Sequence, residues 1–294
     1  MQTSFKPYLQ LHFIIFIWGF TAVLGALIQL DFLSLTWYRM GLSSAFLFLY
    51  ILFNDNERKL LFDFDIKQQF RYIFGGIIIA LHWVAFFYAI KVSNVSITLI
   101  TMSSGAFFTS LLEPYFFKRK VLKHEIVLGL LILIAFYILI KIEKIQLLGV
   151  YVALIAAFLS GLFSVLNGIY VQNESGVKLS FYQLFYGFIF LTLILFIFEN
   201  EQPVPLPSTT DWLYLLILSS ICTAYTFTQS VILMKYISPY TVMISINLEP
   251  VYGIILALLV LGDNEKMHPG FYLGAFLILL IILLNAYFKD KLKE

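Results

Sequence analysis

The sequence is poor in charged residues. Asp, Glu, Lys and Arg together make up 12% of its 294 residues, roughly half the share that a soluble protein carries. Hydrophobic residues make up 61% and gather in repeated apolar runs. This combination is typical of an integral membrane protein, whose helices face lipid instead of water.

Residues and motifs that mark other classes of protein are missing as well. Cys222 is the only cysteine, so an internal disulfide and a cysteine metal cluster are both excluded. No second His, Cys or carboxylate stands at ligand spacing from His82, and we expect no metal site. The sequence also lacks a phosphate-binding glycine loop, a nucleophile elbow and a zincin helix. We therefore expect neither an ATP-driven pump nor an enzyme, and no cofactor.

A basic groove with interleaved aromatic residues, which is typical of nucleic-acid binding, is missing too. The one basic cluster, Lys118–Lys123, is short and is explained by membrane topology or by anionic lipid. The expected partners are therefore the lipid bilayer, a small-molecule substrate and protons, and no nucleic acid. A homodimer is an open alternative to a monomer.

Ten apolar segments are each long enough, at about 20 residues, to cross a bilayer as a helix. They cover residues 8–29, 33–53, 71–90, 94–117, 125–142, 147–171, 180–198, 211–234, 239–261 and 268–288. The first segment has no small-residue cleavage site before Asp31, so we expect a membrane span there instead of a signal peptide. All connections are short and leave no room for a soluble domain.

The basic residues are distributed unevenly between the two sides of these spans. An even number of spans puts both termini on one side, whose loops and tails hold 14 Lys and Arg residues against 4 on the other side. Arg39 lies inside a span and completes the total of 19. Because basic loops stay in the cytoplasm, we predict cytoplasmic termini and a multi-pass protein of the cell's inner membrane.

The two halves of the chain resemble each other weakly. Lys91–Ser96 at the start of the fourth span and Tyr236–Thr241 at the start of the ninth lie 145 residues apart, as do Gly129 and Gly274. Each half holds five spans, an odd number, so the halves must be inserted in opposite orientations. Inverted repeats are typical of transporters that alternate access around a midplane site. We predict an all-α membrane protein of two inverted five-helix repeats, residues 1–143 and 144–294.

The middle of the ninth span breaks the apolar pattern. A charge at membrane depth is costly unless it faces a cavity or a partner, and Pro250 is expected to kink the helix. Glu249 shares a helical face with Ser245 and Tyr252. We interpret this face as a cavity wall whose carboxylate binds a substrate amine or a proton. The alternative is a structural carboxylate bonded across helices. Asn247 lies off this face, and we expect it to bond another helix.

Charged and titratable residues also lie in other spans. His82, beside Trp83 in the third span, can take up a proton near neutral pH or form a neutral hydrogen bond to another helix. Arg39, roughly 9 Å into the second span, can bind a substrate carboxylate. Our favoured interpretation is structural: it snorkels or clamps carbonyls of a neighbouring helix. Glu113 is expected in an ion pair at headgroup level.

Small polar residues follow one side of several spans. They indicate a polar bundle interior, although close helix packing favours the same residues. The stripes are Trp18, Thr21 and Gly25; Ser160, Ser164 and Asn167; and Ser219, Thr223, Thr226 and Ser230. Aromatic residues could stack on an apolar or cationic substrate. The candidate substrate-binding residues are Glu249, Ser245, Tyr252, His82, Trp83, Trp18, Arg39, Asn167, Tyr225 and Gln229.

Several short pieces, in their order and spacing, resemble the EamA-type members of the drug/metabolite transporter superfamily. They are Trp18-Gly19, Arg39, Phe87-Tyr88-Ala89, Val92-Ser93, Leu248-Glu249-Pro250, Leu261-Gly262-Asp263 and Gly274. The resemblance covers essentially the whole chain and implies a ten-helix bundle that moves small metabolites, often amino acids and often outward. First repeats of that family often carry a proline in the fourth span, where this chain has Ser103-Ser104-Gly105.

We therefore predict a secondary transporter, an exporter of amino acids or related compounds that works by alternating access. Within the same superfamily, a lipid-carrier flippase and a nucleotide-sugar carrier are alternatives, and the latter needs more cations than Arg39 supplies. A different class, a non-transporting membrane protein that handles lipid, would be favoured by a catalytic cluster at one interface, which the sequence does not show.

Overall fold

The computed structural model describes residues 5–61, 65–118, 147–198 and 204–291, together with residues 127, 131 and 134. Within these residues the chain is helical and contains no strand. Counting interrupted helices as one, eight of its helices are long and apolar enough to cross a membrane. This confirms the predicted all-α membrane architecture. The fifth expected span, 125–142, lies outside the described residues apart from three isolated positions.

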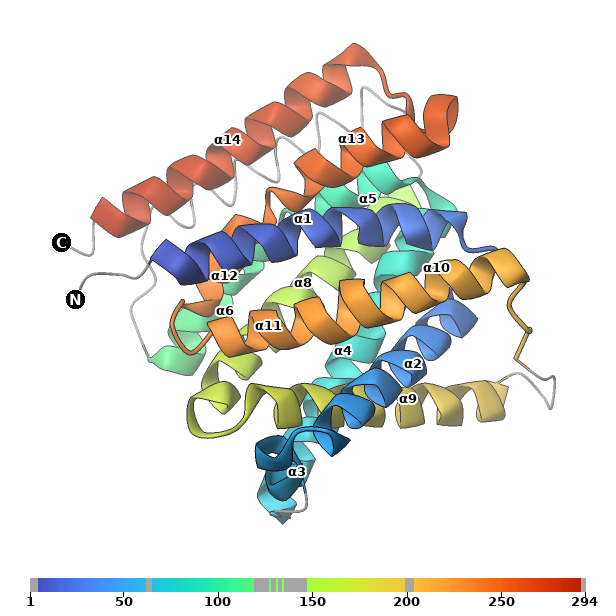
Figure 1. The fold of residues 1–294 in the computed structure, drawn as a ribbon. Helices are drawn as coiled ribbons and strands as arrows, with labels where there is room; N and C mark the ends of the chain where they lie inside the picture. Colours follow the sequence, from blue (N-terminus) through green and yellow to red (C-terminus); the bar gives the residue numbers. More distant parts are fainter. Residues whose placement is uncertain are drawn as a thin grey trace.

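The helix boundaries follow the predicted spans closely. The helices are α1 (Phe5–Leu27), α2 (Phe32–Leu52), α3 (Asp55–Leu61), α4 (Ile66–Val92), α5 (Val95–Met102), α6 (Gly105–Phe117), α8 (Leu147–Tyr170), α9 (Gly176–Phe198), α10 (Thr209–Ser219), α11 (Thr226–Leu233), α12 (Pro239–Ile246), α13 (Glu249–Leu261) and α14 (Pro269–Lys291). Two 3₁₀ turns, η1 (Val171–Asn173) and η3 (Gly262–Glu265), and one π-helix, η2 (Ser220–Tyr225), join them. The start of α1 and the end of α14 lie at the same end of the bundle (Figure 1).

Polar side chains just before the helices fix where many of them begin. Asp31 accepts hydrogen bonds from the amides of Leu33 and Ser34 at the start of α2. Ser208 and Asp211 form a capping box at the start of α10. These caps satisfy backbone amides that have no partner inside the helix. They matter at a membrane surface, where the start of a span would otherwise expose those amides.

The fourth and ninth spans are each broken into two helices, and the break lies at the corresponding position in both. Both consist of an eight-residue helix followed by a thirteen-residue helix, α5 and α6 in one case and α12 and α13 in the other. The capping residues Asn94 and Ser238 are equivalent: each accepts a hydrogen bond from the amide three residues later. They lie 144 positions apart, so the repeat is one residue shorter than the expected 145.

The two broken spans run antiparallel beside each other. The helix α5 contacts α13, and α12 contacts α6, so the first half of each broken span lies against the second half of the other. Their outer neighbours correspond as well, because α1 packs on α13 and α8 packs on α6. Figure 1 shows α1 lying along α13 on one side and along α10 and α11 on the other. The breaks therefore meet inside the bundle.

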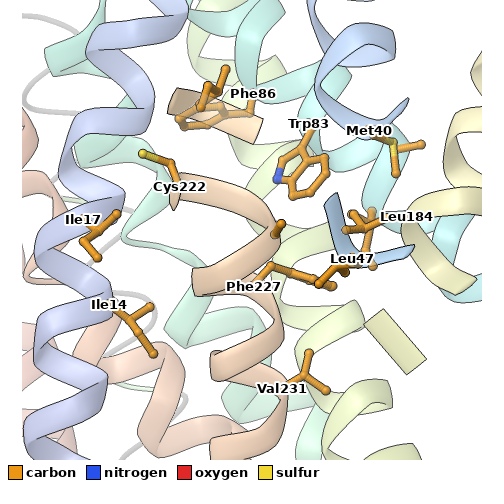
Figure 2. Packing of buried hydrophobic residues seen from close by; sticks show 14 of the residues in the cluster. Ile14, Ile17, Met40, Leu47, Trp83, Phe86, Leu184, Cys222, Phe227 and Val231 are labelled. Carbon is orange, nitrogen blue, oxygen red and sulfur yellow. The ribbon is translucent and has the colours of Figure 1, made fainter. Parts of the chain in front are cut away.

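The main core is built from apolar side chains of α1, α2, α4, α9 and the eighth span. Figure 2 shows Ile14 and Ile17 on α1 facing the helix that carries Cys222 and Val231. All four side chains are buried. The helix α4 packs against both α8 and α9, which makes it the central helix of the bundle.

Close approach between α4 and α9 depends on Gly76. A Cβ atom there would lie 2.4 Å from the carbonyl oxygen of Gln183 and 2.9 Å from the amide of Gly187. Both are backbone atoms and cannot rotate away. The contact therefore requires glycine, as in other membrane helix pairs where small residues let backbones touch.

We expect Gly76→Ala to destabilise the protein by about 1–3 kcal/mol, the usual cost of overpacking. Gly105→Ala is the matched comparison, because its new methyl group would first meet the flexible end of the Met243 side chain at 2.8 Å. Thermal unfolding of the detergent-purified variants measures both. Equal losses in the two variants would contradict the close backbone contact as the cause.

Glu174 lies outside the spans, in the connection between η1 and α9. It is partly buried and accepts a hydrogen bond from the hydroxyl of Tyr72. Burial raises the pKa of Glu174, while the Tyr72 hydroxyl and the positive charges of Lys178 and Arg71 act in the opposite direction. The folded protein therefore binds a proton at this carboxylate more tightly than the unfolded chain does.

This shift makes the stability of the protein depend on pH. A carboxyl whose pKa is raised on folding favours the folded state at low pH, and that advantage is lost as the pH rises through the folded pKa. We expect the wild-type protein to lose stability between about pH 5 and about pH 8, and Glu174→Gln to lose less. Thermal unfolding at both pH values tests this, with Asp55→Asn as an exposed control. The same pH dependence in wild type and Glu174→Gln would refute it.

Candidate substrate site

A cavity of about 90 Å³ lies where the breaks of the fourth and ninth spans meet. Its wall combines aromatic side chains with a few polar ones. The aromatic residues are Trp18, Trp83, Phe86, Phe163 and Phe227. The polar residues are Arg39, His82, Asn247 and Glu249, together with the hydroxyl groups of Thr21, Ser103, Ser160, Ser164 and Ser230. An apolar concave wall with few polar groups is the usual character of a small-molecule site.

The break in the ninth span follows from its proline. Pro250 has no amide hydrogen, so it cannot bond the carbonyl of Ile246, and its ring opposes a continuous helix. The chain turns at Asn247 and Leu248 and resumes as α13 at Glu249. The kink predicted from the sequence is confirmed.

The fourth span breaks at Ser103 and Ser104 without a proline. The hydroxyl of Ser104 donates to the carbonyl of Thr101 at 2.8 Å, and that of Ser103 lies 3.4 Å from the carbonyl of Leu99. Serine hydroxyl groups that bond preceding carbonyls weaken and bend a helix. Ser103 lines the cavity, so both breaks contribute to its wall.

Glu249 faces the cavity as the first residue of α13. None of the described residues forms a hydrogen bond or an ion pair with its carboxylate. The alternative of a structural carboxylate bonded across helices therefore has no support in the geometry. A carboxylate at a helix start is favoured by the partial positive charge of that helix end, which α13 supplies.

Arg39 approaches the cavity from α2. Its side chain is 2% exposed, its Nε donates to the hydroxyl of Thr223 at 2.8 Å, and its Cζ lies 3.9 Å from the centre of the Trp83 ring. The residue neither snorkels nor clamps a carbonyl, so those expectations are wrong. Instead, the hydroxyl of Thr223 and the face of Trp83 hold the guanidinium inside the bundle.

His82 presents one ring nitrogen to another helix. Its Nδ1 lies 2.8 Å from the carbonyl of Ala156 on α8. A carbonyl can only accept, so Nδ1 carries the hydrogen, and in the neutral ring Nε2 is the nitrogen without one. The neutral hydrogen bond to another helix is therefore observed. His82 also lines the cavity, and proton uptake by its Nε2 stays a prediction.

Five of the ten candidate residues line the cavity, and five do not. Those on the wall are Glu249, His82, Trp83, Trp18 and Arg39. Ser245, Tyr252, Asn167, Tyr225 and Gln229 are not among the lining residues. Their places in the fold differ, and each has a physical reason.

Ser245 and Tyr252 were expected on one face with Glu249. That expectation assumed an unbroken helix, whereas the break at Asn247 lets α12 present Val242, Met243 and Ile246 to the cavity. The Ser245 hydroxyl bonds the carbonyl of Thr241 at 2.9 Å. Tyr252 packs edge-on against Phe16 of α1.

The other three candidates serve contacts between helices or face outward. Asn167 accepts a hydrogen bond from Gln183 at 2.7 Å, and Gln229 accepts one from Gln10 at 2.8 Å. Tyr225 is 41% exposed. Asn247, in contrast, was expected to bond another helix but lines the cavity. Its Nδ2 has no hydrogen-bond partner among the described residues.

A glutamate from each broken span caps the start of the other. Glu265, after α13, accepts from the amides of Val95 and Ser96 at 2.9 and 3.0 Å at the start of α5. Glu113, near the end of α6, accepts from the amide of Tyr240 at 3.4 Å at the start of α12. Glu113 is thus buried, and the ion pair at headgroup level expected for it stays a prediction.

A family model matches the chain twice, at residues 6–141 and at residues 147–287, and its description is EamA-like transporter family. The chain belongs to the EamA-like transporter family. This family is part of the drug/metabolite transporter superfamily, so the protein is a membrane transporter, and the resemblance read from its short motifs is confirmed.

The fold of this EamA-like chain also has a solved counterpart. A structure titled "Crystal structure of protein" has a TM-score of 0.72 and covers 98% of this chain and 99% of its own, at 14% sequence identity. At this identity it supports the fold alone. No curated protein sequence matches the chain.

The unpartnered Glu249 and the capping Glu265 should respond differently to neutralisation. We expect Glu249→Gln to leave the melting temperature unchanged or to raise it, because the substitution removes a partly buried charge and breaks no hydrogen bond or ion pair with the described residues. Glu265→Gln removes an acceptor of buried amides and should destabilise the protein by about 1–2 kcal/mol, the usual value of a lost cap. Thermal unfolding in detergent compares the two. A large loss in Glu249→Gln would mean that its carboxylate has a structural role after all.

Proposed function

We propose that this protein is a secondary transporter that exports amino acids or related amines across the cytoplasmic membrane. The observation that carries the proposal is that one cavity wall holds a carboxylate, Glu249, and a guanidinium, Arg39. No ion pair joins the two groups, and Nη1 of Arg39 has no hydrogen-bond partner among the described residues. Opposite charges held apart in an apolar cavity suit a zwitterion, whose ammonium group faces one and whose carboxylate faces the other.

The size of the cavity agrees with such a substrate. If each water-sized atom takes up about 10–15 Å³, the cavity has room for roughly six to nine non-hydrogen atoms. A small amino acid has about this number of non-hydrogen atoms. The wall is apolar and polarisable, with Met102, Met234 and Met243 beside the aromatic rings. We therefore take leucine as the model substrate.

The alternatives of the same superfamily fit the cavity less well. A nucleotide sugar carries phosphate groups that call for several cations, and Arg39 is the sole Lys or Arg among the lining residues that the structure describes. A lipid carrier needs a long apolar groove open to the bilayer, whereas this cavity is small. Both observations favour the amino acid.

In the proposed mechanism, two inverted halves rock about the cavity and expose it to each side in turn. The antiparallel packing of α5 on α13 and of α12 on α6 gives each half one broken span beside the substrate. Glu249 binds the amine or, when the cavity is empty, a proton, and Nε2 of His82 offers a second proton site. The distribution of Lys and Arg supports cytoplasmic termini, and the outward direction is what the family resemblance implies.

Counterflow of leucine into proteoliposomes tests the proposal. We expect Glu249→Gln to lower the initial rate at least about tenfold, because the ammonium loses its charged partner. Asp263→Asn is the matched control, since Asp263 is an exposed carboxylate paired with Lys266. Failure of the wild-type protein to transport leucine or any other amino acid offered would refute the substrate class.

The same assay addresses proton coupling. If Glu249 or His82 carries the proton, the pH dependence of counterflow should be lost in Glu249→Gln or in His82→Gln. An unchanged pH dependence in both variants would exclude proton coupling through these two residues.

A further inference from the structure

The eighth span contains a π-helix at the level of the cavity. The segment η2, Ser220–Tyr225, lies between α10 and α11. Such a segment gives up part of the regular hydrogen-bond ladder, and π-bulges are frequent at functional sites. The hydroxyl of Thr223 donates to the carbonyl of Leu218 at 2.7 Å, five residues back. Its oxygen therefore has its lone pairs free to accept, and it accepts from Nε of Arg39.

The last residue of α10, directly before the π-helix, is also tied to α2 one helical turn further along. The hydroxyl of Ser43 lies 2.9 Å from the carbonyl of Ser219 and 2.6 Å from that of Arg39. Ser43 and Ser219 are both fully buried. Two contacts thus fix α2 against the eighth span, and the second one holds the backbone from which the Arg39 side chain extends.

The remaining donors of Arg39 are not used. The guanidinium lies with its face on Trp83, and an aromatic ring below the plane leaves the in-plane N–H groups free. Nη1 is buried without a hydrogen-bond partner among the described residues, and none of them bonds Nη2. A buried cation with empty donors is costly. Such an arrangement is typical of a side chain that binds an anion.

We propose that Thr223 is a positioning residue, and that η2 places its hydroxyl so that Arg39 offers its Nη1 and Nη2 groups to the carboxylate of the substrate. This inference rests on the proposed transport of amino acids and makes it more specific. The carboxylate is a required element of the substrate, and the side chain that orients its receptor lies outside the cavity wall.

Two ligands separate the carboxylate from the rest of the molecule. Leucine carries both charged groups, and 3-methylbutylamine is leucine without its carboxylate. Binding of each to the purified full-length protein is measured by isothermal titration calorimetry. The variants are Thr223→Val, which removes the hydroxyl at nearly the same volume, Thr223→Ser, which retains it, and Thr228→Val. The last is a buried threonine of α11 outside the cavity wall and serves as the matched control.

We expect the wild type to bind leucine more tightly than the amine. Thr223→Val should weaken leucine about tenfold, which is the loss of one well-placed charged contact, and leave the amine unchanged. Thr223→Ser should restore leucine binding, and Thr228→Val should match the wild type. Size-exclusion chromatography and melting temperature verify folding. If Thr223→Val does not fold, Thr223→Ala takes its place.

The other outcomes overturn the inference in distinguishable ways. If leucine and the amine weaken equally in Thr223→Val, or neither weakens, Thr223 does not position the carboxylate site, and the proposed transport function stands. If the wild type binds both ligands equally, the carboxylate site itself is refuted. If the wild type binds neither ligand and transports no amino acid, the proposed function falls together with this inference.

Discussion

A bilayer offers no hydrogen-bond partner to a backbone amide or carbonyl, so each interruption of a membrane helix must find its partners in the protein or in a polar cavity. This constraint explains where the irregular backbone of this protein lies. The breaks at Ser103–Ser104 and Asn247–Leu248 both border the cavity. The hydroxyl groups of Ser103 and Ser104 bond carbonyls of the preceding turn. Water or substrate in the cavity can bond the backbone groups that the breaks leave without a partner.

The same constraint governs the two charges. A single buried charge is tolerated only when it has a partner or access to a polar space. Glu249 has the start of α13 and the cavity, and Arg39 has a ring, a hydroxyl and the cavity. No ion pair joins the two groups among the described residues. The hydroxyl of Thr223 and the ring of Trp83 fix the Arg39 side chain against the eighth span and α4.

Much of this fold could be predicted from the sequence because its signals are local. Apolar runs defined the spans, and Pro250 indicated the break in the ninth. The break in the fourth span carries no proline and depends on serine hydroxyl groups, which also occur in straight helices, so it was not expected. The hydrogen bond between Glu265 and the start of α5 joins residues 170 positions apart along the chain. No sequence pattern within either segment indicates this contact.

The site was partly predictable for the same reason. Glu249, His82 and Arg39 stand out because charge and imidazole are rare in apolar runs. Thr223 and Asn247 resemble many small polar residues that serve packing, and their roles depend on the π-helix and on the break. Ser245 and Tyr252 were assigned to the cavity by the geometry of a continuous helix, which the chain does not form there.

The position of each break also sets how long a stretch of helix can tilt about it. The helices α6 and α13 each extend for thirteen residues beyond their break, which is roughly 20 Å of helix. A tilt of about 10° at the break would displace the far end of such an arm by about 3 Å, the diameter of a water molecule. Glu113 lies near the far end of α6, and Glu265 follows directly after the far end of α13. Each accepts hydrogen bonds from the first turn of the other broken span. A small bend at either break would therefore be magnified into a much larger displacement at the far end of the arm.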